Sequence, residues 1–459
     1  MGIAADLFHS SNPDKETLHR RITPTDGQQA AQQERWNDLA DFLKARIKDE
    51  TGCSMRTWLQ GSYKFGTQIR PHNAHAQFDI DLGLYFEWEG EPEDGDHEPA
   101  GLKALVHNAL LDYHSDAEND ATSVEDPKER CNRITFAPDF HIDVPCYHLD
   151  AERGARALAT QTLGWEGSDP KAIYVWFKYE QEDQALRTKV RRQVRYFKMW
   201  AALTFSEDSR PSSILLTVLV ADAVREMDIA SIDDADLFEN IAAVVHARLT
   251  DASEVPNPVD TDEDLNRLSD AEHAEFVTQL DTLVDVAARA NGAQDKFTAA
   301  ETWTEAFGLF FPMPEDNEEM VVEKAETNNA LVPFQFDPQI AIVATPKDNK
   351  HVSWKGLNEL RPIPRDCDIV FGLQNAPPAG SRLRWTVRNR GDEAAGENDL
   401  GHHAGEETTI TEHSAYIGDH AMDLTVLLGN QVIGRRRVWI RVRGMAVPPR
   451  NSARRRHVL

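Results

Sequence analysis

The sequence predicts an α+β protein: a mixed β-sheet with helices, then a helical lobe, then a small C-terminal β-sandwich-like domain. Three observations support this fold class. Short alternating apolar segments fill residues 58–147, apolar residues recur at helical spacing in residues 170–310, and short strands separated by Gly and Pro return from about residue 334. We therefore divide the 459 residues into 1–205 with the sheet and an N-terminal helix, 206–318 with the helical lobe, 330–445 with the β-rich domain, and a basic tail at 446–459.

The charge balance of the chain limits its partners. It has 77 acidic and 49 basic residues, a formal net charge of -28. Because such a surface repels a phosphate backbone, we do not expect stable binding to nucleic acid, and a polyanionic substrate would need a local cationic pocket or metal ions. The mean hydropathy is -0.53, and no run approaches the ~18 apolar residues of a membrane-spanning helix. The N-terminus lacks the apolar core of a signal peptide, so we predict a cytoplasmic protein without a membrane segment.

Apolar residues recur at helical spacing in five segments. These are Gln28–Lys48, Val190–Ala201, a stretch that opens at Pro211, Asp234–Thr250 and Asp270–Ala290. Residues 58–147 show the alternation of strands instead, interrupted by the acidic loop Glu87–Glu98, and we interpret that region as β-rich.

The most informative strand is Phe78–Phe86 (FDIDLGLYF), which alternates strictly between apolar and other residues. Its apolar side chains share one face, and Asp79 and Asp81 project together from the other, ~7 Å apart along the strand. Two carboxylates held this close repel each other unless a cation lies between them. Their oxygen atoms suit Mg²⁺, which leaves coordination positions open for phosphate oxygens.

A further strand, Phe140–Pro145 (FHIDVP), directs Asp143 away from its apolar face, together with His141. Three carboxylates on neighbouring strands can hold two metal ions, which steady the attacking and leaving oxygens in phosphoryl transfer. The simpler interpretation is that Asp-x-Asp is the solvated face of a half-buried strand, and the motif alone does not decide between the two.

Gly61-Ser62 lies 17 residues before Asp79, counted from the serine. A glycine lets the backbone approach phosphates closely, and a serine hydroxyl can donate to phosphate oxygens, although the pair alone is typical of a simple turn.

Together, Gly61-Ser62, Asp79-x-Asp81 and Asp143 resemble the motif of the polymerase-β nucleotidyltransferase superfamily. Over roughly residues 20–315 the sequence is similar to the cyclic-GMP-AMP-synthase/dinucleotide-cyclase-like nucleotidyltransferases (CD-NTases of the SMODS type) of bacterial anti-phage signalling (CBASS). The matching segments are LQGSYKFGTQIRP, FDIDLGLYF, HIDVPCY, GWEGSDPKAIYVWF, RRQVRYFKMW and RPSSILLTVLV. The resemblance implies a polymerase-β-like core, with the three aspartates as catalytic residues and as ligands of two Mg²⁺ ions, or of Mn²⁺.

The resemblance also implies a set of nucleotide-binding residues. They are Gln60, Gly61 and Ser62 at the donor site, Lys198 on the helix after the sheet, and Ser213 at the start of the next helix. The residues themselves leave alternatives open. Lys198 and Arg195 could form a solvated helix face with packed aliphatic stems, and either Ser213 or Ser212 could cap its helix.

The C-terminal segments WTVRNRG (Trp385–Gly391) and AYIGDH (Ala415–His420) resemble the adenylyl/guanylyl cyclase and SMODS-associated C-terminal sensor domain. This second resemblance implies a nucleotide or another small effector as the ligand of that domain.

The two resemblances imply an enzyme that makes a cyclic oligonucleotide second messenger from NTPs (ATP and/or GTP), releases pyrophosphate, and activates a downstream effector protein in antiviral defence. Two alternatives stay open. One is linear nucleotidyl transfer, as in oligoadenylate synthesis, RNA tailing or NMP transfer to a protein. The other is an inactive fold that serves as a nucleotide-sensing adaptor.

Overall fold

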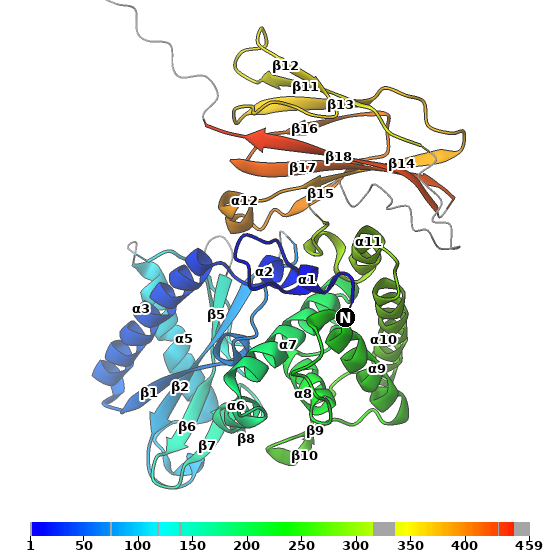
Figure 1. Cartoon of the computed structure of the whole chain (residues 1–459). Helices are drawn as coiled ribbons and strands as arrows, with labels where there is room; N and C mark the ends of the chain where they lie inside the picture. The colour runs from blue at the N-terminus through cyan, green and yellow to red at the C-terminus, as the bar shows by residue number, and fades with distance from the viewer. Residues whose placement is uncertain are drawn as a thin grey trace, which may run out of the picture. The chain divides into compact units, whose positions relative to one another are not determined.

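The chain forms two compact units in a computed structural model, Met1–Met313 and Pro314–Leu459 (Figure 1). The structure describes residues 2–73, 76–116, 119–136, 140–314, 336–429 and 431–444. The predicted basic tail at 446–459 lies outside the described residues. The division between 1–205 and 206–318 stays a prediction, since residues 1–313 form a single unit.

The first unit is built on an eight-stranded sheet in the order β3-β4-β5-β2-β6-β7-β8, with β1 paired to β2. Its strands are β1 (Met55–Gln60), β2 (Phe78–Glu87), β3 (Ala121–Val124), β4 (Asn132–Phe136), β5 (Phe140–Val144), β6 (Cys146–Asp150), β7 (Ala155–Ala159) and β8 (Trp165–Gly167). β1 pairs with β2 antiparallel, whereas β5 and β6 pair parallel with its first and second halves. Pro145 separates β5 from β6, at the strand end that the sequence predicted.

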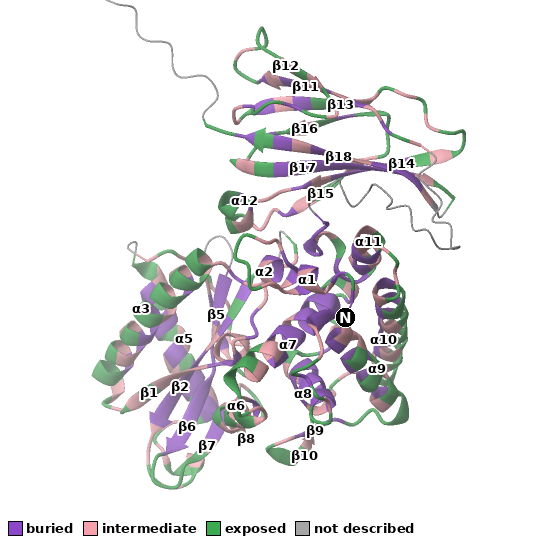
Figure 2. Cartoon of the chain, viewed as in Figure 1, coloured by how far each residue is buried: buried purple, intermediate pink, exposed green. Residues whose placement is uncertain are grey.

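One face of β2 is buried against the helices α3 (Asp26–Thr51) and α5 (Pro99–Ser115) (Figure 2). The buried cluster contains Phe78, Ile80, Leu82, Leu84 and Phe86 of β2, Leu39, Leu43 and Ile47 of α3, and Leu102, Val106 and Leu110 of α5. Because alternate side chains of a strand point to opposite faces, this burial leaves Asp79 and Asp81 on the other face of the sheet.

Helix α5 corrects the interpretation of residues 58–147 as a β-rich region broken only by an acidic loop. Pro99 opens the helix in its first turn, where the missing N–H of proline costs no hydrogen bond. Leu102, Val106 and Leu110 then recur every four residues, so the helical signal is present in the sequence. The surrounding strands led to the wrong assignment of this segment.

Helices form most of the rest of the first unit, as predicted for residues 170–310. They are α6 (Pro170–Tyr179), α7 (Gln184–Thr204), α8 (Ser213–Val224), α9 (Asp234–Asp251), α10 (Asp270–Asn291) and α11 (Lys296–Phe307), with the short α1 (Ala5–Phe8), α2 (Leu18–Ile22) and α4 (Gly61–Phe65), the 3-10 turns Pro92–Asp94 and Gly308–Phe310, and the small strands β9 (Pro256–Asn257) and β10 (Asp260–Asp264). Phe8 of α1 is buried, and its ring centroid lies 4.8 Å from that of Trp303 and 5.3 Å from that of Tyr196, both edge-to-face. The N-terminal segment is therefore part of the helical core. Among the described residues, none of the helices combines the length and the apolar character that crossing a membrane requires.

The second unit consists of two antiparallel four-stranded sheets, in the orders β12-β11-β13-β16 and β15-β14-β17-β18. Its elements are β11 (Ile340–Pro346), β12 (Trp354–Leu357), β13 (Cys367–Leu373), β14 (Ser381–Arg388), α12 (Asp392–Gly396), β15 (Gly401–Gly405), β16 (Thr409–His413), β17 (Gly418–Leu428) and β18 (Gln431–Val442). Residues from both sheets, among them Phe371, Trp385 and Leu424, form one buried cluster, so the sheets pack face to face. The predicted β-sandwich-like domain is confirmed.

Candidate active site

The two aspartates of the Asp-x-Asp motif lie on the polar face of β2, beside β5. The parallel register places Asp79 next to His141 and Asp81 next to Asp143. The central strand of a rigid sheet thus brings together the three carboxylates that the sequence predicted to meet.

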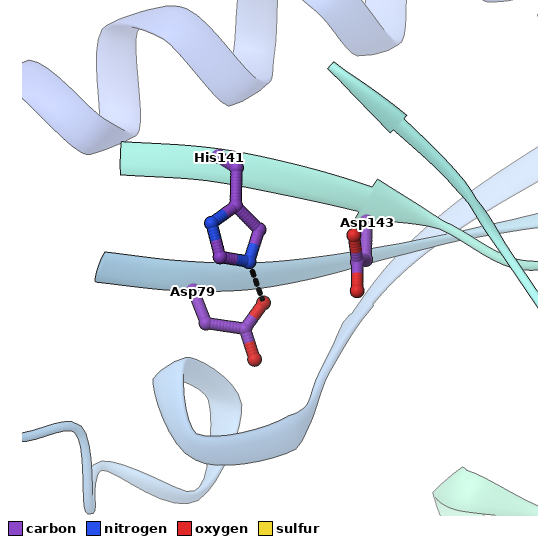
Figure 3. Close-up of side chains that lie close together, drawn as sticks. All are labelled: Asp79, His141 and Asp143. Atoms are coloured by element: carbon purple, nitrogen blue, oxygen red, sulfur yellow. Dashed lines mark ion pairs between the residues drawn. The ribbon is translucent and has the colours of Figure 1, made fainter. Parts of the chain in front are cut away.

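Asp79, His141 and Asp143 form a tight cluster (Figure 3). One ligand atom from each lies within 4.8 Å of the others, a grouping that could hold a metal ion. His141 Nε2 lies 3.1 Å from Asp79 Oδ1. The Asp79 side chain is 51% exposed, whereas that of His141 is 11% exposed. Asp79 is therefore the carboxylate that an incoming ion meets first.

The third carboxylate of the motif, Asp81, lies deeper. Burial raises its pKa well above the ordinary value, and the neighbouring charges of Asp79 and Asp143 add to the effect. Burial tends to raise the pKa of Asp79, but the contact with His141 and the charges of Arg133 and Lys198 hold it below its usual range. A half-buried carboxylate flanked by two others has an unfavourable energy that a divalent cation would relieve, so these residues fit a Mg²⁺ or Mn²⁺ site.

Arg133 of β4 neutralises Asp143. Its Nε donates to Asp143 Oδ1 at 2.6 Å and its Nη2 donates to Oδ2 at 2.8 Å. This bidentate geometry fixes the orientation of the carboxylate. Each carboxylate oxygen has a second lone pair, so the ion pair leaves Asp143 able to accept a metal ion as well.

The Gly-Ser pair forms the turn from β1 into α4. Gly61 has a left-handed φ of 55°, and a Cβ at this position would lie 1.8 Å from Oδ2 of Asp81. Only glycine permits this contact, so the turn and the carboxylate depend on each other. Ser62, the next residue, lines the cleft in front of the carboxylates.

Helix α7 reaches the same region through two cations. Lys198 Nζ donates to the carbonyl of Thr67 at 3.1 Å, and Arg195 Nε donates to the carbonyl of Gln68 at 3.2 Å. Gln68 in turn donates from Nε2 to the carbonyl of Asp79. Burial lowers the pKa of Lys198 to about 8, while the charge of Asp79 acts in the opposite direction. The solvated helix face that the sequence left open does not describe these two side chains.

The two serines before α8 have different positions. Ser212 is the N-cap, and its Oγ accepts a hydrogen bond from the Leu215 N–H at 3.3 Å. Ser213 begins the helix, is exposed, and lines the cleft. The capping alternative thus applies to Ser212.

Gln60 is placed differently from the other predicted nucleotide-binding residues. Its amide is buried, donates to the Tyr85 hydroxyl at 2.8 Å and accepts from the Tyr147 hydroxyl at 3.1 Å. Its side chain is not part of the cleft lining. A nucleotide contact by Gln60 remains a prediction.

The cleft has a volume of about 760 Å³ and is open to solvent. This lies within the roughly 300–1,000 Å³ of a small-molecule pocket. Its walls include Ser62, Asp79, Arg133, His141, Lys198 and Ser213. Four of these wall residues, Ser62, Asp79, Lys198 and Ser213, are predicted site residues, and they come from four separate elements, α4, β2, α7 and α8.

Two further arginines line this cleft, Arg70 and Arg210. Arg70 is 4% exposed. The Nε of each is buried and has no hydrogen-bond partner within the part of the chain that the structure describes. Burial lowers the pKa of Arg70 to about 10 and also lowers that of Arg210. Both guanidinium groups would gain hydrogen bonds from a bound anion.

The sequence analysis did not identify Arg133, Arg70 or Arg210 as site residues. The alternation of β4, in which Ile134 is buried, could have placed Arg133 on the polar face of the sheet. Its pairing with Asp143 depends on the register between two strands. Arg70 and Arg210 lie outside regular elements, where the sequence pattern carries no signal for position.

Family models match both parts of the chain. Residues 55–147 match the nucleotidyltransferase domain of cyclic GMP-AMP synthase DncV-like proteins, and residues 319–443 match the adenylyl/guanylyl and SMODS C-terminal sensor domain. These matches confirm the two resemblances found in the sequence motifs.

Curated relatives and solved structures agree with the domain matches. The chain is 27% identical over 459 residues to a cyclic GMP-AMP synthase of Escherichia albertii, covering 98% of each. It is 27% identical over 315 residues to the cyclic GMP-AMP synthase of Vibrio cholerae, covering 56% of this chain and 68% of the relative. The crystal structure of Vibrio cholerae DncV cyclic AMP-GMP synthase has a TM-score of 0.57 at 19% identity, covering 68% of this chain and 97% of that one. The predicted nucleotidyltransferase fold is confirmed.

Proposed function

We propose that this chain, which carries a DncV-like nucleotidyltransferase domain and an adenylyl/guanylyl and SMODS C-terminal sensor domain, makes a cyclic oligonucleotide from NTPs and releases pyrophosphate. One observation carries the proposal: the carboxylates of Asp79, Asp81 and Asp143 meet on one face of the sheet, at a cleft lined with cations. The full-length similarity to a protein named cyclic GMP-AMP synthase supports ATP and GTP as the substrates.

Asp79, Asp81 and Asp143 would hold the divalent cations, for which we propose two ions, Mg²⁺ or Mn²⁺. Such ions lower the pKa of an attacking hydroxyl and stabilise the negative charge of the leaving pyrophosphate. The chain itself contributes the rigidity of the site. β2 and β5 fix the spacing of the carboxylates, and Arg133 fixes the orientation of Asp143.

Ser62, Lys198 and Ser213 would position the nucleotides. Ser62 follows a glycine that permits close approach of the backbone, and its hydroxyl can donate to a phosphate oxygen of the donor NTP. The Lys198 ammonium, which donates a hydrogen bond to the Thr67 carbonyl, lies in the same cleft and can neutralise the charge of a phosphate. Fixing the acceptor hydroxyl opposite the donor α-phosphate supplies much of the rate in reactions of this kind.

Arg70 and Arg210 extend this binding surface away from the carboxylates. Their charge, and Nε atoms that have no hydrogen-bond partner among the described residues, suit the polyphosphate of a second NTP or the phosphates of a linear intermediate.

We propose further that the product is a second messenger in anti-phage defence in the cytoplasm, where it activates an effector protein, and that the C-terminal domain binds a nucleotide or another small effector. The similarity of residues 20–315 to CD-NTases and the sensor-domain match at 319–443 support this part.

The test is synthesis by the purified full chain from a mixture of the four NTPs with Mg²⁺. The release of pyrophosphate reports turnover, and mass spectrometry identifies the product. We expect a product that resists phosphatase, because a ring has no terminal phosphate.

The alternatives give different outcomes in the same experiment. A phosphatase-sensitive ladder would replace ring closure with linear transfer. Absence of pyrophosphate with every NTP and with both Mg²⁺ and Mn²⁺ would favour the nucleotide-sensing adaptor.

A further inference from the structure

A histidine lies among the metal-binding carboxylates. His141 is 9% exposed, and its Nε2 faces Asp79 and the Asp143 side of the site (Figure 3). Nε2 lies 3.1 Å from Asp79 Oδ1, a contact that is an ion pair when the ring is protonated. Within the described part of the chain, this buried nitrogen has no hydrogen-bond partner. A buried polar atom of this kind calls for a ligand that the protein alone does not supply.

The other ring nitrogen of His141 is held from outside the site. Nδ1 lies 3.1 Å from Oε1 of Gln77, an acceptor, and the tautomer with its proton on Nδ1 makes this hydrogen bond. That tautomer has a lone pair on Nε2, which lies beside the carboxylates. Metal-binding histidines are usually oriented in this way, by a hydrogen bond from the nitrogen that does not bind the metal.

We infer that His141 Nε2 is a ligand of the divalent cation held by Asp79 and Asp143, and that this nitrogen makes the site select Mn²⁺ over Mg²⁺. The inference rests on the proposed function only in using the same carboxylates. Mg²⁺ prefers an all-oxygen set, whereas first-row transition metals accept imidazole nitrogen readily. A cation between Nε2 and the two carboxylates would have all three groups as ligands.

A purely positioning role is the alternative. There the ring is protonated at both nitrogens and pairs with Asp79, holding that carboxylate for ions bound only by oxygen. The two roles differ in one observable, a bond between the metal and nitrogen.

Pulsed EPR of Mn²⁺ bound to the full-length protein, without nucleotide, distinguishes them. We expect modulation from a directly coordinated imidazole ¹⁴N in the wild type and its loss in His141→Asn. Competition of Mg²⁺ against Mn²⁺ on the same samples should show the preference for Mn²⁺ falling by about tenfold or more in the variant, in the range seen when groups supporting a metal are removed.

His72→Asn is the matched control, because His72 lines the same cleft but lies outside the cluster. It should keep both the nitrogen signal and the Mn²⁺ preference. The inference is overturned if Mn²⁺ does not bind stoichiometrically, if wild type shows no ¹⁴N modulation, or if His141→Asn retains it. Cyclic product formed with Mg²⁺ alone would leave the proposed function standing in any of these cases.

Discussion

At the scale of single residues, the site keeps a charge in an unfavourable place. Asp81 packs against Gly61 with two other carboxylates nearby, and its pKa is raised first by burial and then by Asp79 and Asp143. When folding raises the pKa of a carboxyl group, the free energy of unfolding of the protein falls as pH rises above the ordinary titration range of that group, because the folded state resists ionisation. At neutral pH the metal-free protein therefore carries this cost.

Asp81→Asn should remove both the energetic cost of ionising this side chain and the catalytic activity. In EDTA at pH 7 we expect the free energy of unfolding to rise, because the amide carries no charge that burial and the neighbouring carboxylates oppose. Pyrophosphate release should fall by at least about 10²-fold. Thermal denaturation and a pyrophosphate assay measure the two effects. Asp262→Asn, on an exposed residue of β10, makes the same charge change and should alter neither. A lower melting temperature for Asp81→Asn would show that the ionised carboxylate stabilises the fold.

A second residue links the fold to pH. His19 of α2 accepts a hydrogen bond from Arg195 Nη1, with the two nitrogens 3.2 Å apart. Burial, followed by the charges of Arg195 and Arg192, lowers its pKa to about 3 from 6.5. Between these two values the unfolded chain binds a proton that the folded chain rejects, so stability falls as pH decreases through this window.

His19→Gln keeps an acceptor for Arg195 and removes the titration. We expect little change at pH 7, and a smaller loss of stability than wild type between pH 6 and pH 4, by up to ~1.4 kcal/mol per pH unit. Urea denaturation at several pH values measures it. Parallel pH profiles for wild type and variant would contradict the assignment, and exposed His351→Gln serves as the control.

At the scale of elements, the turn from β1 into α4 joins backbone conformation to the site. Gly61→Ala would place a methyl group 1.8 Å from Asp81 Oδ2, in addition to a left-handed φ of 55°. Gly154 is the matched control, with a φ of 71° and open space around the added Cβ. Gly154→Ala should cost about 1–2 kcal/mol from the backbone alone.

Gly61→Ala should therefore lose more stability than Gly154→Ala and also lose activity, because Asp81 must move. We expect pyrophosphate release to fall by at least about 10²-fold in Gly61→Ala and to stay near wild type in Gly154→Ala at temperatures where both are folded. Equal activity in the two variants would show that the conformation of the Gly61 turn does not determine the position of Asp81 in the site.

The elements also show which features a sequence can predict. Asp79, Asp81 and Asp143 share a face because of strict alternation within each strand, a local property that can be read directly. The boundaries of α3 and α9 followed from periodicity in the same way. The pairing of Arg133 with Asp143 and of Gln77 with His141 depends on strand register and loop packing, which join residues distant in the chain. Gln60 illustrates the same limit, since its partners Tyr85 and Tyr147 come from two other strands.

At the scale of the whole molecule, the net charge of -28 coexists with a cleft lined by Arg70, Arg133, Lys198 and Arg210. The sequence established that a polyanion would need such a local concentration of cations, but its composition could not place them. Their convergence comes from the fold, in which loop, strand and helix residues meet at one face of the sheet.

The two units have separate cores, since the buried cluster around β2 lies within Met1–Met313 and the cluster around Trp385 lies within Pro314–Leu459. A variant that weakens one core should therefore unfold that unit selectively. Asp423 of β17 offers such a variant, because it is buried, accepts from Arg437 Nε at 2.6 Å and Nη2 at 2.7 Å, and accepts from Arg388 Nε at 2.8 Å.

Asp423→Ala leaves two buried guanidinium groups without this carboxylate, and breaking a buried pair costs about 3–5 kcal/mol. Asp419→Ala, on the same strand, removes an ion pair with Arg443 in which both side chains are 49% exposed, and should cost less than about 1 kcal/mol. Hydrogen exchange followed by mass spectrometry should show lost protection in β14, β17 and β18 of Asp423→Ala, with unchanged protection in β2 and α7. Loss of protection in β2 as well would mean that the first unit depends on the second for its stability, because the substitution touches no residue of the first core.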